Sequence, residues 1–543
     1  MLVRFFTQNV ESYTKPQPNS INLQRNFLMK ISNSILLLSS VVSPISLMAE
    51  TKKPNIIIIM TDQQRADLLA REGYPLNTMP FVDSLARQGA WFNKAYTSCP
   101  ASVPARTSLL TGRFPKATHV RSNQNESDAF YESDIFKVAK EKGYKTALVG
   151  KNHSFLTKDK VDYWSPYFHG GQMGGKKTAT EANFDNFLKE TELYASLTPS
   201  PDGVEGQLPY RMVNDASKWI ANVKSDPFLM WFSISEPHNP YQVCEPYFSM
   251  FANSLPKIAT SSADRKLKGP QYEQLAEMMK LGHIGYEENL TRLRLNYLGM
   301  LRLIDDQIAR LVDNLKQQGV YDNTIIVFLS DHGDYMGEYG LMKKGAGVAE
   351  ALTRIPMQWT GPGIKANAKP QDACVSMVDI FPTICEIMDA EIPIGVQGRS
   401  LWPLLKGENY PKKEFESVLV EQGYGGEFYT KADGTDYAVE GAIVDNKNFF
   451  DEQNTWTQSG SRRMLRKGDW KIVMDMDGNG ELYNLKTDKA ELKNLFEEAK
   501  YQSIKIELMQ DLLKWEISTE DPLPIPQHRY RFKRNVHNYL FSK

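Results

Sequence analysis

The sequence predicts an α/β protein: a large, mostly parallel β-sheet sandwiched by helices, with a small C-terminal α+β subdomain that carries an antiparallel sheet. Two observations lead to this prediction. Apolar, β-branched runs that end in ionisable residues alternate with segments whose apolar residues recur at helical spacing. After about residue 460, short runs separated by turn signals replace these long units.

Four apolar runs are expected to be buried parallel strands. They span residues 54–62, 144–153, 227–238 and 323–334. In open α/β sheets, ligands bind beyond the carboxyl ends of the strands. The ionisable residues that end the four runs are therefore expected to converge on one site.

Helical patterns occupy the intervals between these runs. Residues 79–92 and 295–319 keep apolar residues at helical spacing, and the second segment ends in a glycine. Residues 240–288 are expected to form a polar insertion that contains a helix. In the C-terminal part, Asp477-Gly478-Asn479-Gly480 predicts a hairpin turn, and residues 504–515 predict a closing helix.

The N-terminal segment has the features of an export signal. Lys30 precedes an apolar run, residues 35–42, that is too short to span a bilayer, and small residues follow as far as Ala49. A buried helix is the alternative interpretation, and Met29 is a candidate for the true start. We expect export to the periplasm or secretion, without a transmembrane anchor. The expected domains are a targeting segment (1–49), a catalytic domain (50–459) and a C-terminal subdomain (460–543).

The composition argues against nucleic-acid binding and against a cysteine-based zinc site. The formal net charge of -1 argues against a nucleic-acid binder, because such proteins carry a clear basic excess. The four cysteines match no zinc pattern, and we interpret them as structural or incidental. Cys374 and Cys385 are candidates for a disulfide in an exported protein.

The stretch SCPASVPARTSLLTGRFP places a small hydroxyl between prolines, ahead of an arginine. It is either a nucleophile beside an anion-binding group or a turn that leads into a helix. Ser102, Pro104 and Arg106, followed by Leu-Thr-Gly, fit the pattern Ser/Cys-x-Pro-x-Arg, and here the chain resembles the sulfatase family. Cys99 lacks the proline and arginine at that spacing. The resemblance implies an alkaline-phosphatase-like fold and oxidation of Ser102 to formylglycine (3-oxoalanine), an aldehyde, by a radical-type sulfatase-maturating enzyme.

The resemblance covers about residues 53–496 and implies a metal site. Most of its donors are oxygen atoms, so we expect one calcium ion per chain. Gln63 stands where many relatives have aspartate, and His332 where others have asparagine. The implied ligands are Asp62, Gln63, Ser102, Asp331 and His332.

The resemblance also implies a set of catalytic residues. In the hydrated aldehyde, one hydroxyl attacks sulfur and the other re-forms the carbonyl and expels sulfate. Three cationic side chains neutralise the sulfate, His153 acts as the base on the hydrate, and His238 is the general acid for the leaving oxygen. The set is Ser102, Arg106, Lys151, His153, His238 and Lys344.

Six further residues are candidates for the sugar pocket. Four of them lie in predicted loops, where an exposed polar side chain without a binding role is an equal alternative. The other two lie in the predicted C-terminal sheet, where packing against protein is the alternative. The six are His119, Arg121, Asn123, His169, Trp470 and Lys471. For Asp334 and Glu338 we favour helix capping or solvation, and for Lys343 a solvated charge.

The leading hypothesis is an exo-acting carbohydrate sulfatase whose substrate is a sulfated saccharide. Glycosaminoglycan-derived N-acetylgalactosamine sulfate is the first expectation, with algal polysaccharides and mucin glycans as alternatives. A second hypothesis is a phosphonate or phosphodiester hydrolase of the same superfamily. A third is a non-catalytic protein that binds sulfated glycans and whose Ser102 is never oxidised.

Overall fold

The computed structural model describes residues 52–192, 194–283, 285–429, 443–444, 447–448, 458–520 and 535–542. Lys52–Lys543 forms one compact unit. The expected targeting segment, residues 1–49, lies outside the described residues. In the part of the chain that is described, no helix is both long and apolar enough to cross a membrane.

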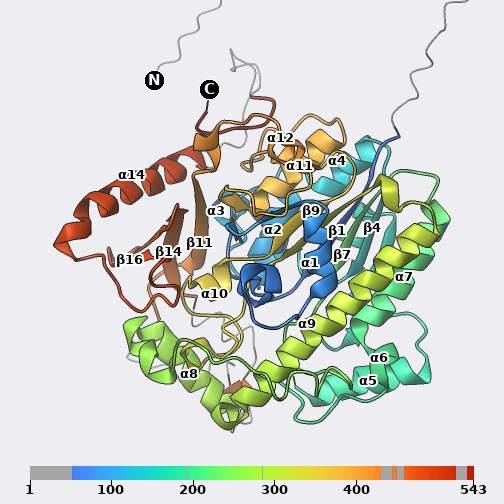
Figure 1. The fold of residues 1–543 in the computed structure, drawn as a ribbon, viewed down its shortest axis with the longest axis horizontal. Helices are drawn as coiled ribbons and strands as arrows, with labels where there is room; N and C mark the ends of the chain where they lie inside the picture. The colour runs from blue at the N-terminus through green and yellow to red at the C-terminus, as the bar shows by residue number, and fades with distance from the viewer. Residues whose placement is uncertain are drawn as a thin grey trace, which may run out of the picture. The chain divides into compact units, whose positions relative to one another are not determined.

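The four predicted strands lie side by side at the centre of one sheet (Figure 1). Strand β1 (Asn55–Thr61) is parallel to β8 (Thr324–Ser330) on one side and to β7 (Phe228–Ser233) on the other. Strand β4 (Lys145–Gly150) is parallel to β7. Because these strands point the same way and are adjacent, their carboxyl ends meet at one edge of the sheet.

Antiparallel pairs lie toward the outside of this sheet. Within the described residues, the strand order is β2-β9-β8-β1-β7-β4-β5-β6. Strand β9 (Met357–Thr360) is antiparallel to both β8 and β2 (Ala90–Phe92), and β6 (Gly171–Gln172) is antiparallel to β5 (Tyr163–Phe168). The mostly parallel sheet is thus confirmed.

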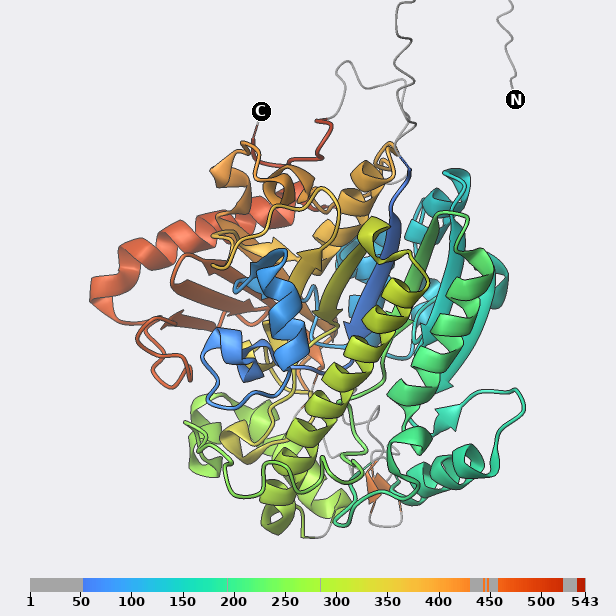
Figure 2. The same ribbon diagram turned by 45° about the vertical axis from the view of Figure 1, so that its right-hand side comes forward.

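Helices cover both faces of the sheet (Figure 2). Ile57 and Ile59 of β1 pack in one apolar cluster with α1, α7 and α9, whereas Ile56 and Ile58 pack in another with α2, α4 and α11. Each isoleucine is 0% exposed, and burying such a side chain stabilises the fold by about 2–3 kcal/mol. The helices are α1 (Pro80–Arg87), α2 (Ser102–Thr111), α4 (Ile135–Glu141), α7 (Leu208–Val223), α9 (Tyr286–Gln317) and α11 (Ile380–Ile387).

Two predicted helices differ from the structure at their ends. Residues 79–92 contain α1, but their last three residues form strand β2. Gly89 permits this change, because a Cβ there would lie 1.9 Å from the Trp359 carbonyl oxygen. Helix α9 begins nine residues before the predicted Leu295, in a polar first turn where Glu287 and Glu288 favour the helix N-terminus. The helix expected within the insertion is α8 (Pro270–Gly282).

An antiparallel sheet lies in the C-terminal part of the chain, as predicted. Its order among the described residues is β11 (Ser417–Gly425), β14 (Gly460–Lys467), β15 (Trp470–Asp475) and β16 (Gly480–Asn484). The predicted turn joins β15 to β16, and the Asp475 carboxylate accepts hydrogen bonds from two backbone N–H groups of the turn. Strand β11 precedes residue 460, so this sheet takes one strand from the segment assigned to the catalytic domain. The domain boundary itself stays a prediction.

Helix α14 (Gln502–Ser518) closes this part of the molecule and includes the predicted 504–515 helix. Its buried side chains are Leu508, Leu512 and Trp515. They pack with apolar side chains of β14, β15 and β16 in a separate small core. One face of the helix therefore packs on the antiparallel sheet and covers its apolar side chains.

The cysteines, all four of which are described, are buried free thiols. The disulfide considered for Cys374 and Cys385 is therefore wrong, and the two side chains lie in different apolar clusters. Burial raises the pKa of the Cys99 and Cys385 thiols. Cys99 is thus a poor source of thiolate although it lies close to Ser102 in sequence.

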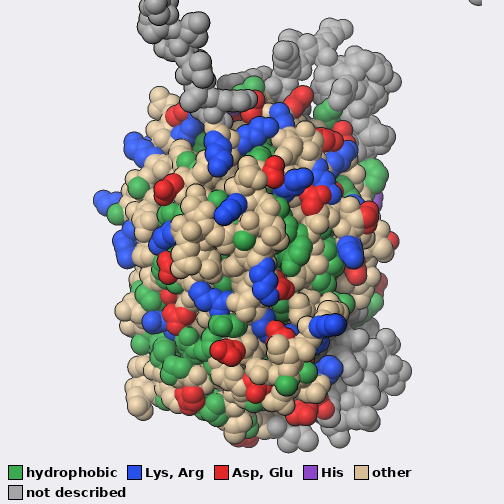
Figure 3. Space-filling view, turned by 90° about the vertical axis from the view of Figure 1, so that its right-hand side faces the viewer, with side chains coloured by type: hydrophobic (Ala, Val, Ile, Leu, Met, Phe, Trp, Pro, Cys, Tyr) green, Lys and Arg blue, Asp and Glu red, His purple; other side chains and the backbone are tan. Residues whose placement is uncertain are grey.

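The surface on the side of α7 carries acidic and basic side chains intermixed (Figure 3). Neither sign dominates that face. This distribution agrees with the near-neutral net charge of the chain.

Candidate active site

Ser102 is the first residue of α2, and it is 0% exposed. Its Oγ lies 3.0 Å from His332 Nε2, and Lys344 Nζ donates a hydrogen bond to it at 3.1 Å. The start of the helix is fixed by Asn123, whose Oδ1 accepts a hydrogen bond from the Val103 N–H. The hydroxyl thus lies at the positive end of a helix, which favours negative charge at this position.

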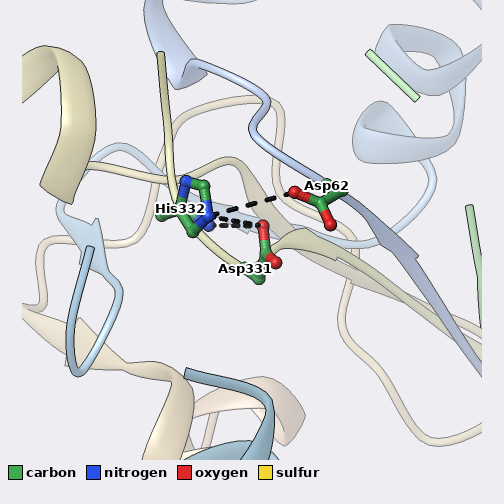
Figure 4. Close-up of side chains that lie close together, drawn as sticks. All are labelled: Asp62, Asp331 and His332. Carbon is green, nitrogen blue, oxygen red and sulfur yellow. Dashed lines mark hydrogen bonds and ion pairs between the residues drawn. The ribbon is translucent and has the colours of Figure 1, made fainter. Parts of the chain in front are cut away.

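Asp62, Asp331 and His332 lie together beside this serine (Figure 4). Asp62 follows β1 and the other two follow β8, and their candidate ligand atoms all lie within 4.8 Å of one another. His332 donates from Nδ1 to the Gly333 carbonyl oxygen, so its Nε2 lone pair faces Ser102. Asp62 Oδ1 is buried and has no hydrogen-bond partner among the described residues. Carboxylate oxygens with one imidazole nitrogen suit a divalent cation.

Gln63 is held in a fixed orientation by its neighbours. Its backbone lies in the left-handed region (φ 67°), and its N–H donates to Asp331 Oδ1 at 3.0 Å. The side-chain amide donates from Nε2 to Asp334 Oδ2 at 2.6 Å, while Lys344 donates to the amide oxygen at 3.4 Å. The oxygen of Gln63 therefore lies on the side of Lys344, which also contacts Ser102, and its nitrogen lies on the side of Asp334.

Asp334 is buried, which corrects the expectation of a capping or solvated acid. It is 0% exposed, and it accepts a hydrogen bond from the Tyr241 hydroxyl in addition to the one from Gln63. Burial raises its pKa to about 6. Glu338 is also held by protein groups, since Arg65 and the Thr260 hydroxyl donate to its carboxylate. Spacing in the sequence gave no sign of either set of partners.

Arg106 neutralises both carboxylates of the cluster from the second turn of α2. It is 0% exposed and donates at 3.0 Å to Asp62 Oδ2 and, through Nε, at 3.0 Å to Asp331 Oδ2. Lys151 forms a close ion pair with Asp62. Burial alone would raise the pKa of Asp62, but Lys151 and the other cationic groups hold it well below its usual value.

Histidines extend the site along the strand ends. His169 accepts a hydrogen bond from Lys151 Nζ at 2.8 Å and stacks on His238, with the ring centroids 3.8 Å apart. His238 donates from Nδ1 to the Asn239 carbonyl oxygen at 2.6 Å. His153 has positive φ (43°), and its Nδ1 has no hydrogen-bond partner within the described residues. Burial holds the pKa of all three imidazoles well below the usual value.

Lys343 is 1% exposed, so the expectation of a solvated charge is wrong. Its Nζ lies 3.2 Å from His283 Nε2, and its backbone N–H donates to the Tyr241 hydroxyl. Burial lowers its pKa to about 7. Tyr241 and His283 were not predicted from the sequence. Tyr241 lies shortly after β7, but a tyrosine in a proline-rich loop is not by itself a functional signal.

The six candidates for the sugar pocket lie in different surroundings. His169 and Asn123 contact the site through Lys151 and α2, as described above. His119 is exposed and stacks on Phe130, with centroids 5.5 Å apart, and Arg121 lies in the same loop. Their role as sugar contacts stays a prediction.

Trp470 and Lys471 belong to the antiparallel sheet. Trp470 lies 5.5 Å from the Tyr501 ring, between centroids. Lys471 is 0% exposed, forms a 2.7 Å ion pair with Glu491 and donates to the Val348 carbonyl oxygen at 2.6 Å. These contacts join the sheet to a loop of the larger domain. The predicted sugar-binding role of both residues remains untested.

The structure is a mostly parallel α/β sheet with helices on both faces, and a serine lies among carboxylates and histidines at the ends of its strands. A family model described as Sulfatase matches residues 54–390. The chain therefore belongs to the sulfatase family and is a sulfuric ester hydrolase, as the motif around Ser102 predicted.

Known relatives extend this similarity over most of the chain. The chain is 26% identical to an uncharacterized sulfatase of Escherichia coli, covering 87% of this chain and 88% of that protein. It is 24% identical to an N-acetylglucosamine-6-O-sulfatase of Bacteroides thetaiotaomicron, covering 97% and 96%. The structure of a phosphonate monoester hydrolase from Agrobacterium radiobacter superposes with a TM-score of 0.70 at 22% identity, covering 87% and 97%.

Proposed function

We propose that this sulfatase removes sulfate from a sulfated sugar, with the nucleophile formed from Ser102. The observation that carries the proposal is the charge around that residue. Three buried cations surround it: Arg106 and Lys151 pair with the carboxylates of Asp62 and Asp331, and Lys344 donates to Ser102 Oγ. The resulting excess of positive charge, enclosed in protein, suits a sulfate monoester anion.

Asp62, Gln63, Asp331 and His332, with the side chain at position 102, are proposed to hold one Ca²⁺. When bound, the ion supplies positive charge that polarises the sulfate and lowers the pKa of a hydroxyl at position 102. Two oxygen atoms support this assignment: Asp62 Oδ1, which is buried without a hydrogen-bond partner among the described residues, and the amide oxygen of Gln63, which lies on the Lys344 side. Removing metal with a chelator should lower both activity and melting temperature, and Ca²⁺ should restore both. Full activity of metal-free protein would refute the site.

Conversion of Ser102 to formylglycine is proposed, because serine itself would leave a stable sulfate ester on the enzyme. Lys344, which donates to Oγ, then orients the side chain at position 102. Arg106 and Lys151 hold Asp62 ionised. His153 lies after β4 with positive φ, and it is proposed as the base that removes a proton from this side chain.

His238 is proposed as the acid that protonates the leaving oxygen. Its Nδ1 is occupied by the Asn239 carbonyl oxygen, so Nε2 is the atom that exchanges the proton. Burial keeps the ring neutral at rest, and a bound sulfate anion favours its protonation. His238→Ala should slow esters with poor leaving groups by about 100-fold and activated aryl sulfates much less. Equal losses on both would remove this assignment.

The substrate is proposed to be a glycosaminoglycan-derived N-acetylhexosamine sulfate, cleaved at a chain end, with N-acetylgalactosamine sulfate tested first. The similarity to a protein named for activity on an N-acetylglucosamine sulfate supports an amino-sugar substrate. His119, Arg121, Asn123, His169, Trp470 and Lys471 are the proposed contacts. A screen of defined sulfated saccharides tests the choice, and preference for algal or mucin glycans would replace it.

Export to the periplasm is proposed from the N-terminal sequence, and a radical-type maturating enzyme is the proposed transient partner. N-terminal sequencing of the mature protein tests the first. Absence of cleavage near Ala49 would contradict it. Co-expression with and without the maturase tests the second, and equal activity in both would contradict it.

Aryl esters that differ only in the group to be cleaved distinguish a sulfatase from a phosphonate or phosphodiester hydrolase. We expect kcat/KM for an aryl sulfate to exceed that for the corresponding aryl phosphate diester and phosphonate. The reverse order would favour the phosphonate or phosphodiester hydrolase, whose fold this chain shares. Binding of sulfated glycans without turnover, by protein that retains unmodified Ser102, would favour the non-catalytic alternative.

A further inference from the structure

The Tyr241 hydroxyl lies between two segments that carry active-site residues. One segment holds Gln63, just after β1, and the other holds Lys344, in the loop before α10 (Glu350–Thr353). Neither Gln63 nor Lys344 belongs to a helix or a strand. Because no helical or sheet ladder fixes these two residues, their positions depend on individual hydrogen bonds.

The first contact of the hydroxyl reaches Gln63 through Asp334. Tyr241 donates to Asp334 Oδ2 at 2.6 Å, and the same oxygen accepts a hydrogen bond from Gln63 Nε2 at 2.6 Å. Gln63 Nε2 also lies 3.4 Å from the hydroxyl oxygen. These bonds hold the amide nitrogen on the Asp334 side, so the amide oxygen takes the opposite side, where Lys344 donates to it.

The second contact of the hydroxyl reaches the residue before Lys344. The hydroxyl oxygen of Tyr241 accepts a hydrogen bond from the Lys343 N–H at 3.0 Å, and the Lys343 carbonyl oxygen accepts one from the Tyr335 N–H at 2.9 Å. The backbone directly before Lys344 is therefore held at both of its polar groups. Lys344 Nζ in turn donates to Ser102 Oγ at 3.1 Å.

Both segments have an unusual backbone conformation where they contact this hydroxyl. Gln63 has φ 67° and Lys343 has φ 65°, in the left-handed region that favours glycine. Such conformations persist only where the surrounding contacts hold them, and they are concentrated in active sites. The Tyr241 hydroxyl contacts both residues, which indicates that it helps to hold both conformations.

Tyr241 itself is fixed by segments outside the site. It is buried, and its N–H donates to the Tyr194 carbonyl oxygen at 2.9 Å. Its own carbonyl oxygen accepts hydrogen bonds from the Ser196 N–H at 3.0 Å and from Asn296 Nδ2 at 2.9 Å. None of these three contacts uses the hydroxyl. A phenylalanine at this position would therefore keep them and remove only the bonds of the hydroxyl.

We propose that Tyr241 is a positioning residue whose hydroxyl acts on both sides of the active site. Through Asp334 it orients the Gln63 amide so that the amide oxygen is available to a metal. Through the Lys343 backbone it holds Lys344 against the side chain at position 102. The first part rests on the proposed calcium site, whereas the second depends only on the contact between Lys344 and Ser102.

Tyr241→Phe in the full, matured chain tests the role of the hydroxyl. Loss of a hydrogen-bond partner of a metal ligand typically costs about 10- to 100-fold in metal affinity or activity. We therefore expect Ca²⁺ to bind the metal-free variant about 10-fold more weakly in isothermal titration calorimetry. For an aryl sulfate, kcat should fall about 10-fold while KM changes less than about threefold, because Lys344 acts on the nucleophile position.

Tyr247→Phe is the matched control. Tyr247 is buried, and its hydroxyl also donates to an aspartate, Asp306, at 2.8 Å. Removing that hydroxyl should lower stability and leave Ca²⁺ affinity and kcat unchanged. If Tyr241→Phe matches Tyr247→Phe in both measurements, the proposal is overturned, since the Tyr241 hydroxyl would then serve stability alone.

Asp334→Asn tests the path from the hydroxyl to Gln63. It should by itself weaken Ca²⁺ binding about 10-fold, which keeps the test valid if Tyr241→Phe fails to fold, and unchanged affinity would overturn this path. Combined with Tyr241→Phe, it should weaken binding no more than the stronger single variant, because both remove the same contact. Independent losses of about 100-fold in total would mean that the hydroxyl does not act through Asp334.

The wild-type chain distinguishes failure of this proposal from failure of the calcium site. A wild-type chain that binds no Ca²⁺ would refute the proposed calcium site. In that case kcat of Tyr241→Phe, measured with the metal that supports activity, decides the part that acts through Lys344. An unchanged kcat overturns that part, and a loss of about 10-fold supports it.

Discussion

This protein contains two clusters of buried charged side chains that are built from the same residue types but differ in role. The catalytic cluster surrounds Ser102, and the junction cluster joins the antiparallel sheet to the larger domain. In the junction cluster, Lys268 donates to Glu481, to the Tyr483 hydroxyl and to a backbone carbonyl, all within 3.4 Å. Lys471 is paired with Glu491.

The pKa of one buried lysine in each cluster, Lys268 and Lys151, shifts in opposite directions. Burial lowers the pKa of Lys268, but its acidic partners outweigh burial and raise it well above the usual value. In the catalytic cluster, burial lowers the pKa of Lys151 despite its ion pair with Asp62. The junction cluster is thus satisfied and stabilises the fold, while the catalytic cluster retains capacity to bind an anion and a cation. Perturbed, incompletely matched charges are typical of functional sites.

Ser102→Ala should have the largest effect, because it removes the nucleophile. We expect kcat/KM for aryl sulfates to fall by at least about 10⁴-fold with little change in melting temperature. Cys99→Ala, three residues away, is the matched control and should retain activity within about threefold. Retained turnover in Ser102→Ala would move the reaction to another residue.

Lys344→Met and Lys471→Met compare the two clusters directly. Lys344→Met should lower kcat/KM by about 10³-fold and change the free energy of unfolding by less than about 2 kcal/mol. Lys471→Met leaves Glu491 buried without its ion-pair partner, and should cost about 3–5 kcal/mol of stability. The folded fraction should keep its activity on aryl sulfates, which lack the sugar that Lys471 is proposed to contact.

Adding Glu491→Gln to Lys471→Met should recover part of the stability, because it removes the unpaired charge. The measurements are steady-state kinetics and denaturant unfolding. A stable Lys471→Met that loses saccharide turnover would support the sugar-binding role predicted from the sequence.

Gln63→Glu tests whether the hydrogen bond to Asp334 fixes the orientation of the Gln63 side-chain amide. The new carboxylate would contact the Asp334 carboxylate at the place of a 2.6 Å hydrogen bond, and should lower stability by about 2–3 kcal/mol and activity about 10-fold. Gln63→Glu with Asp334→Asn reverses the hydrogen bond and should restore most of both. If the double variant is no better than the single one, Asp334 does not orient residue 63.

The last prediction concerns the pH dependence of stability. Burial lowers the pKa of His332 to about 4, so between pH 6.5 and 4 the unfolded chain binds a proton that the folded chain does not. The unfolding free energy should fall as pH drops through this range. In chelator, His332→Asn should reduce that fall by up to about 3 kcal/mol.

The fold and the chemistry at the strand ends could be read from sequence, because buried strands are β-branched runs and the residues that follow them carry ionisable groups. Contacts between distant segments could not be read. Gln63 and Asp334 are separated by 271 positions, and only the register of β1 beside β8 brings them together. The burial of Lys343 likewise depends on a loop that packs on Tyr241. The sequence of Trp470 and Lys471 in a short strand does not show whether their side chains contact a sugar or pack against other protein side chains.

Peptide mass spectrometry of active enzyme, matured in its host, tests the central claim most directly. The account predicts that the peptide containing residue 102 is lighter than the serine form by roughly 2 Da, as loss of two hydrogens requires, and that activity scales with the converted fraction. A fully active preparation in which residue 102 is entirely unmodified serine would contradict it.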